Sequence, residues 1–221
     1  GDTVTVGYTP GTNTIKDASD NGSVALTTQA VANNTVVPFK TLTLTTGADA
    51  GDDFAGTVGD DSYSASILTL GSGDSLVDAT TTDNDTLTVT TNAAITNGTT
   101  ITNIENIKVT ALGTTTVDMA NISGVKEFTT NGSTGSITIN NADSAAMALA
   151  FIGTTNNNVT VNYDAGTLSG TSDSLAMTAT SAKAVTVDVD AGFESAILTV
   201  NGTGNTITSV TAPGATFSLA G

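Results

Sequence analysis

One segment of this 221-residue chain, Leu44 to Val89, is unusually rich in aspartate. Nine of the eighteen aspartates lie between Asp49 and Asp85, and no lysine is closer than Lys40 on one side and Lys108 on the other. Glycine, serine and threonine separate the acids. Carboxylates packed this closely repel one another and weaken a compact fold. The segment therefore restricts the chain to folds that neutralise these charges.

Calcium ions would remove the repulsion, because calcium accepts about six to eight oxygen ligands from carboxylates, backbone carbonyls and water. Magnesium fits less well, since it favours octahedral sites and retains its water. An alternative role for the acids is to cap turns and keep the surface soluble. We predict a calcium-dependent folding unit, assisted by carbonyls of the glycine-containing turns, whose metal ligands are Asp49, Asp52, Asp53, Asp60, Asp61, Asp74, Asp83 and Asp85.

Beyond this segment the sequence consists largely of short runs in which Thr, Val and Ile alternate, as is typical of β-strands. Their spacing of 13 to 30 residues predicts an irregular parallel β-solenoid with variable loops, in which each coil depends on its neighbours. Two of the runs, VTVNYDAG at Val159 and VTVDVDAG at Val185, agree at six of eight positions. The stretch NADSAAMALAFIG at 140–153 has a helical composition and predicts either a short helix or a loop packed on a coil.

The first 37 residues are different in character. Val4, Val6 and Tyr8 alternate with polar residues and predict a strand, turns follow at 9–11 and 17–22, and 24–37 supplies one or two more strands. So few strands cannot bury a core alone. We therefore expect residues 1–37 to be the closing strands of a β-sandwich, 38–40 (Pro-Phe-Lys) to be a stiff linker, and 41–221 to be the solenoid.

Composition excludes several classes of function. The formal net charge is −16, all five basic residues are lysine, and arginine, histidine and cysteine are absent. Binding to nucleic acid or to an anionic membrane needs cationic contacts that this chain lacks. Catalysis by Ser-His-Asp or Cys-His groups is excluded, and aromatic residues make up only 4%, too few for a typical sugar-cleaving site. We predict that the chain is not an enzyme, with no catalytic or organic-cofactor residues, and that it does not insert into a membrane.

Two parts of the sequence resemble known families. Thr3 to Thr35 resembles the end of the immunoglobulin-like repeats of large bacterial surface proteins. Thr41 to Tyr63 (TLTLTTGADAGDDFAGTVGDDSY), with LGSGDSL at Leu70 and ITNIENIKVT at Ile101, resembles the lattice domains of bacterial surface-layer (S-layer) proteins. Those proteins are exported by type I secretion and are related to the repeats-in-toxin (RTX) family. The complete RTX nonapeptide GGxGxDxUx is missing, so we expect a few irregular calcium sites and no extended calcium β-roll.

The resemblance implies a structural protein of the bacterial cell surface that assembles with copies of itself into an S-layer when calcium is present. A cell-surface polysaccharide is a further candidate partner. The alternative is a calcium-rigidified module of a giant adhesin or biofilm protein, which the immunoglobulin-like beginning favours. In either case we expect an extracellular location and a sequence that is part of a longer chain.

Overall fold

The computed structural model describes residues 4–8, 19, 26–31, 37–96, 98–155 and 157–221. The chain divides into two compact units, Gly1–Val37 and Pro38–Gly221. In the first unit, β1 (Val4–Tyr8) and β2 (Leu26–Val31) pair in an antiparallel ladder. The turns predicted at 9–11 and 17–22 lie almost entirely outside the described residues, as do Asp17 and Asp20.

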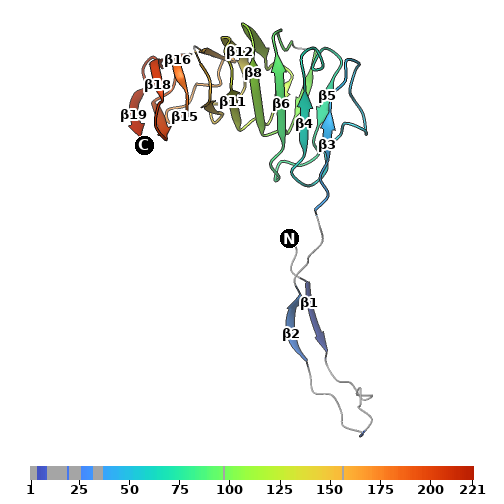
Figure 1. The fold of residues 1–221 in the computed structure, drawn as a ribbon. Coiled ribbons are helices and arrows are strands. Elements are labelled where there is room, and N and C mark those ends of the chain that lie inside the picture. Colours follow the sequence, from blue (N-terminus) through green and yellow to red (C-terminus); the bar gives the residue numbers. More distant parts are fainter. Residues whose placement is uncertain (1–3, 9–18, 20–25, 32–36, 97, 156) are drawn as a thin grey trace. The chain divides into compact units, whose positions relative to one another are not determined.

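The second unit is a parallel β-solenoid of about eight turns, as the sequence predicts. Its strands form three parallel sheets, and Figure 1 shows the strands of successive turns side by side. The nine-stranded sheet contains β3 (Thr41–Thr43), β4 (Ser62–Ala65), β6 (Thr86–Thr91), β8 (Asn106–Ala111), β11 (Glu127–Asn131), β13 (Ala148–Ile152), β15 (Ser174–Thr180), β17 (Ser195–Asn201) and β19 (Thr216–Ala220). The five-stranded sheet contains β9 (Thr115–Asp118), β12 (Ile137–Ala142), β14 (Asn158–Tyr163), β16 (Lys183–Val189) and β18 (Thr206–Thr211). The three-stranded sheet contains β5 (Ser75–Val77), β7 (Thr100–Thr102) and β10 (Ile122–Ser123).

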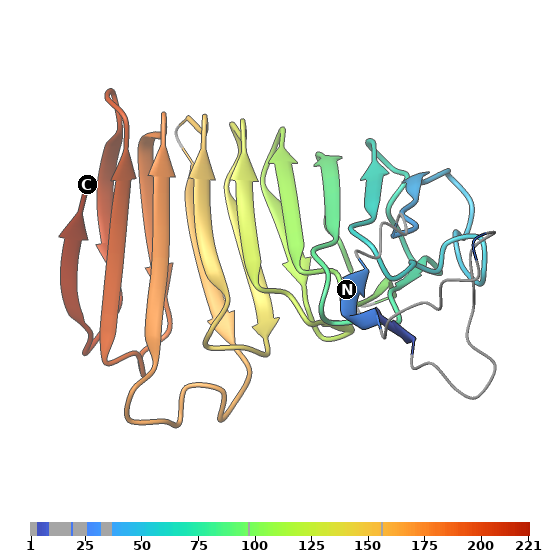
Figure 2. The same cartoon turned by 90° about the horizontal axis from the view of Figure 1, so that it is seen from below.

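Successive turns have nearly the same length. In the nine-stranded sheet, each strand contributes one residue to a continuous series of paired positions that runs from Leu42 through Phe128 to Leu219. Five of the eight steps along this series are 21 residues long, and the others are 20, 24 and 28. The 24-residue step contains much of the acid-rich segment. The 28-residue step contains the loop at 164–173, which extends beyond the neighbouring turns (Figure 2).

The interior of the solenoid is built from stacked apolar ladders. The series just described points inward, and its members from Tyr63 to Leu198 are at most 4% exposed. On the five-stranded sheet Val117, Ile139 and Val161 stack in register and are fully buried. Burying a side chain of this size contributes about 1.5–3 kcal/mol. Because the neighbouring turns on both sides cover each inner residue, no single turn has a core of its own.

The last turn shows the same dependence. Phe217 and Leu219 of β19 continue the apolar pattern but are 49% and 69% exposed, because no described turn packs beyond this strand. At the other end, Lys40 already belongs to the solenoid, since its carbonyl accepts a 2.9 Å hydrogen bond from the amide of Ser62.

The stretch at 140–153 is a strand region, and the helix or loop that its composition suggests is not formed. β12 continues to Ala142, and β13 begins at Ala148 after a short turn. β13 pairs in register with β11 on one side and β15 on the other, and these ladder hydrogen bonds override the helix preference of alanine. The described residues form no helix, and hence none long and apolar enough to cross a membrane.

Candidate metal centre

Three successive corners of the solenoid bring acidic side chains together. They precede β4, β6 and β8 and comprise residues 56–61, 78–85 and 103–105, which we call the acidic corner. The corners are equivalent, because Val77 pairs with Thr102 before them and Thr86 pairs with Asn106 after them. The middle corner has eight residues where the next has three. Its extra residues fold outward and give the corner room for additional side chains.

A ladder of hydrogen bonds connects the acids that end these corners. The backbone amide of Lys40 donates to Oδ1 of Asp61, that of Asp61 donates to Oδ1 of Asp85 at 2.7 Å, and that of Asp85 donates to Oε2 of Glu105 at 3.0 Å. The three acids are at most 2% exposed. A buried amide at a corner needs an acceptor, and the carboxylate of the next turn supplies it. This requirement places three carboxylates one above another.

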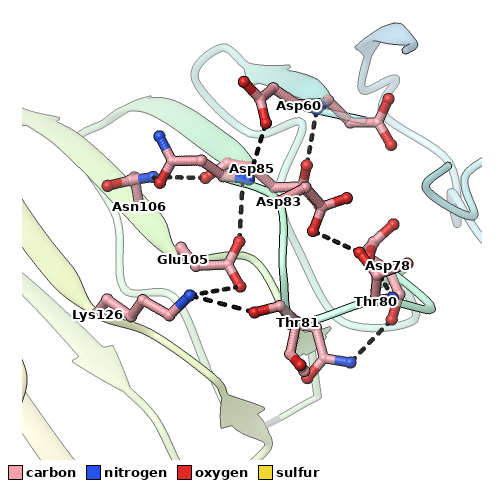
Figure 3. Close-up of polar contacts among 12 residues, drawn as sticks. Asp60, Asp78, Thr80, Thr81, Asp83, Asp85, Glu105, Asn106 and Lys126 are labelled. Carbon is pink, nitrogen blue, oxygen red and sulfur yellow. Dashed lines mark hydrogen bonds and ion pairs between the residues drawn. The ribbon is translucent and has the colours of Figure 1, made fainter. Parts of the chain in front are cut away.

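A lysine lies at each end of the ladder. Nζ of Lys126 is 3.4 Å from Oε1 of Glu105 and donates to the carbonyl of Thr81 at 3.4 Å (Figure 3). Nζ of Lys40 donates to the carbonyls of Asp52 at 3.1 Å and Ala55 at 2.6 Å. Of these two ammonium groups, only that of Lys126 pairs with a carboxylate of the acidic corner.

Asp78 adds a fourth buried carboxylate at the beginning of the middle corner. Its Oδ2 accepts a 2.6 Å hydrogen bond from the amide of Thr80, and the residue is 1% exposed. Gly56 occupies the equivalent position one turn earlier. A Cβ atom there would lie 2.1 Å from Oδ1 of Asp78 and 2.9 Å from Oδ2 of Asp61. Glycine is therefore needed at position 56 to leave space for the two carboxylates.

Several buried oxygens of the acidic corner have no hydrogen-bond partner among the described residues. They are Oδ1 of Asp78, Oδ2 of Asp83 and Oδ2 of Asp85, and the buried hydroxyl of Tyr63 on the adjoining strand is also unpaired. The other carboxylate oxygen of Asp83 accepts from the hydroxyl of Thr80 at 2.5 Å (Figure 3). A buried polar atom without a partner costs about 1–3 kcal/mol, and more when it is charged. Three such carboxylate oxygens in one corner point to a bound cation.

The electrostatics of the corner agree with this geometry. Burial raises the pKa of Asp85 to about 7, and the negative charges of Asp78, Asp83 and Asp61 raise it further, against a lowering effect of the Asp61 amide. Burial also raises the pKa of the Tyr63 hydroxyl, with the same four aspartates adding to the effect. Without a counter-ion, the corner therefore favours a proton on Asp85 at pH values where an ordinary aspartate is ionised.

The carboxylates form two overlapping groups whose ligand atoms lie within 4.8 Å of one another. The first group is Asp61, Asp78 and Asp85, all buried, and the second is Asp83, Asp85 and Glu105. Such clusters of buried acids can bind a metal ion. Because every ligand is a carboxylate oxygen, and the described chain has no histidine or cysteine, the donor set suits hard cations.

The structure brings together three of the eight predicted ligands, namely Asp61, Asp83 and Asp85. Asp52, Asp53 and Asp60 are exposed, and none of them belongs to either group within the described chain. Oδ1 of Asp60 accepts a 3.0 Å hydrogen bond from the amide of Asn84.

The remaining two predicted ligands, Asp49 and Asp74, lie at another corner and cap backbone amides there. Oδ2 of Asp49 accepts from the Thr45 amide at 2.7 Å, and its Oδ1 accepts from the Thr45 hydroxyl at 2.9 Å. Asp74 accepts from the amides of Asp49 and Gly71 at 2.9 and 2.8 Å. All four oxygens have partners within the chain. This arrangement matches the turn-capping alternative for these two residues.

Two residues of the metal-binding groups, Asp78 and Glu105, were not among the predicted ligands. Glu105 is the nearest acid to β8, and it precedes that strand as Asp61 and Asp85 precede β4 and β6. This repeated position directly before a strand is the signal that could have identified it. Asp78 has no equivalent acid in the neighbouring turns, since Gly56 and Asn103 occupy those positions.

Comparison with protein-family models, with curated proteins and with solved structures found no match for the chain.

Proposed function

We propose that this chain is a calcium-stabilised structural segment of a bacterial cell-surface layer. The observation that carries the proposal is the acidic corner, where Asp78 and Asp85 are buried with unpaired carboxylate oxygens. A cation bound there joins three successive turns near the beginning of the solenoid. In this account the ion is part of the folded structure and has no catalytic role.

Calcium suits the corner better than magnesium. The candidate ligands come from corners of different length and include acids already held by backbone amides, so their positions follow the turns of the solenoid. Calcium tolerates such irregular sets and variable coordination numbers, whereas magnesium requires near-octahedral geometry with short bonds.

The overall charge supports assembly that depends on a divalent cation. Copies with a formal charge of −16 repel one another at low ionic strength. The exposed Asp52, Asp53 and Asp60 belong to the same turns as the acidic corner and offer oxygens for ions shared between copies. Calcium would therefore order the first turns and also reduce the repulsion between neighbouring molecules.

A second candidate function is a stalk or binding module of a large adhesin. The division of the chain into two compact units at Val37 and Pro38 favours this alternative, because serial modules are the usual construction of such proteins. In an adhesin the same calcium site would stiffen the solenoid, and no lattice of identical copies would form.

Negative-stain electron microscopy of the purified chain, first stripped of metal and then dialysed into calcium or magnesium, separates the two functions. Two-dimensional sheets that form in calcium and disperse in EGTA are the expected result. Isolated rods in calcium would contradict the surface-layer function and favour the adhesin.

A matched pair of variants connects the assembly to the acidic corner. We expect Asp85→Asn to need far more calcium for sheet formation than the wild-type chain. Asp188→Asn removes the same charge from an exposed position of β16 and should assemble like the wild-type chain. Equal calcium requirements for both variants would show that assembly does not depend on the corner.

A further inference from the structure

Asp85 belongs to both groups of potential metal ligands. Asp61 and Asp78 lie in the first group only, and Asp83 and Glu105 lie in the second only. Figure 3 shows Asp83, Asp85 and Glu105 converging from neighbouring turns, with Asp78 on the other side of Thr80. The five acids thus define two compartments that share one carboxylate.

Each compartment has its own unpaired oxygen. Oδ1 of Asp78 is free in the first compartment, and Oδ2 of Asp83 is free in the second. Oδ2 of Asp85, which is fully buried, is free in the ligand shared by both. Oδ1 of Asp85 is held by the Asp61 amide, which fixes the orientation of the carboxylate. One ion in the first compartment would leave the Asp83 oxygen unpaired, and one ion in the second would leave Asp78 unpaired.

The charge of the corner leads to the same number of ions. The two groups contain five carboxylates, and Lys126 supplies the one ammonium group that pairs with them. Full ionisation therefore leaves four negative charges in a largely buried site. Two divalent cations balance these charges, whereas a single one leaves two negative charges uncompensated.

We infer that the acidic corner holds two calcium ions, bridged by the carboxylate of Asp85. The inference rests on the proposed calcium function and deepens it by assigning the number of ions and the role of each acid. Asp61 and Asp78 bind the first ion, Asp83 and Glu105 bind the second, and Asp85 binds both. Lys126 ends the row of ions, because its ammonium group occupies the far side of Glu105.

Equilibrium dialysis of the full chain against calcium chloride, with bound calcium measured by mass spectrometry, tests the number directly. The wild-type chain and the control Asp188→Asn should bind two ions in the acidic corner. Asp78→Asn and Glu105→Gln should each lose one ion and keep the other. Asp85→Asn should lose both, or bind both at least tenfold more weakly. Asparagine and glutamine keep an amide oxygen as acceptor for the Thr80 and Asp85 amides, and circular dichroism verifies the fold.

Each result has a distinct meaning. One ion in the wild-type chain that is lost in Asp78→Asn but retained in Glu105→Gln would overturn the second compartment and leave the proposed function intact. One ion lost in both variants would indicate a single shared site and would also overturn the inference. No bound calcium in the wild-type chain would overturn the proposed function itself. If Asp85→Asn fails to fold, the other two variants still decide the number of ions.

Discussion

The backbone amide of Asp61 donates a 2.7 Å hydrogen bond to Oδ1 of Asp85, the equivalent residue one turn later in the solenoid. The same bond recurs near the other end, where the amide of Asp173 donates to Oε2 of Glu194 at 2.7 Å. An acid before a strand of the nine-stranded sheet is thus a structural cap. Within the described chain, Asp173 and Glu194 have no third acid close enough to complete a metal-binding group. Asp78 and the longer middle corner are what convert the cap into a candidate metal site.

Replacing Gly56 by alanine should disrupt metal binding through a steric effect. The new Cβ would overlap Oδ1 of Asp78, so this carboxylate must move away from Asp61 and Asp85. We expect calcium affinity to fall at least tenfold, measured by isothermal titration calorimetry. The control is Gly71→Ala, because a Cβ at Gly71 meets no atom within 4 Å. Equal affinities for the two variants would contradict the placement of Asp78 in the site.

Replacing Asp74 by alanine should destabilise the protein without changing calcium binding. The substitution leaves the amides of Asp49 and Gly71 without their acceptor, at a cost of about 1–3 kcal/mol. Urea unfolding should show this loss with calcium and with EGTA alike. Asp74→Asn retains an acceptor oxygen and should lose less. A loss seen only in calcium would instead make Asp74 a metal ligand.

The metal-free protein should become less stable as the pH rises from about 4 to about 7. Burial raises the pKa of folded Asp85 to about 7, above the value of about 3.9 in an unfolded chain. Between these values the folded state retains a proton that the unfolded state has lost, so the free energy of unfolding decreases with pH and then levels off. Urea titrations of metal-free protein across this range measure the slope.

Two comparisons check the origin of that slope. Asp85→Asn should flatten the profile, and Asp188→Asn should not. Calcium binds the ionised carboxylates, so its stabilising effect should increase over the same pH range. A wild-type profile that rises with pH in the absence of metal would contradict the shifted pKa of Asp85.

The strands could be predicted from the sequence, but their distribution between sheets could not. Of the six recognised runs, those at Leu87, Ile107 and Leu198 belong to the nine-stranded sheet, and those at Ile137, Val159 and Val185 belong to the five-stranded sheet. Counting both kinds together gave irregular spacings and hid the regular step of 21 residues. Alternation of Thr and Val reports that a strand has an inner face, but it does not report which sheet the strand joins.

The internal repeat illustrates the same limit. VTVNYDAG and VTVDVDAG align Val159 with Val185, whereas in the structure Val159 pairs with Val187. The register is shifted by two residues, which keeps the same side chains inside. The long loop at 164–173 absorbs the difference.

The acid-rich segment indicated the region of the candidate site, and the structure selects particular residues within it. Asp60 and Asp61 are adjacent in sequence, yet Asp60 is exposed and Asp61 is buried, because successive residues point to opposite sides of the chain. Glu105 lies outside the dense segment and reaches the site only through the stacking of turns. Local density of charge could not distinguish these cases.

Thermal unfolding of the full chain in calcium, in magnesium and in EGTA tests the central claim most directly. Each ion at a free concentration about 100-fold above its dissociation constant adds about 2.7 kcal/mol, which corresponds to a rise of roughly 5–10 °C in Tm. We expect this rise in calcium, a much smaller one in magnesium, and none in the Asp85→Asn variant. Equal Tm values for the wild-type chain in calcium and in EGTA would contradict the account.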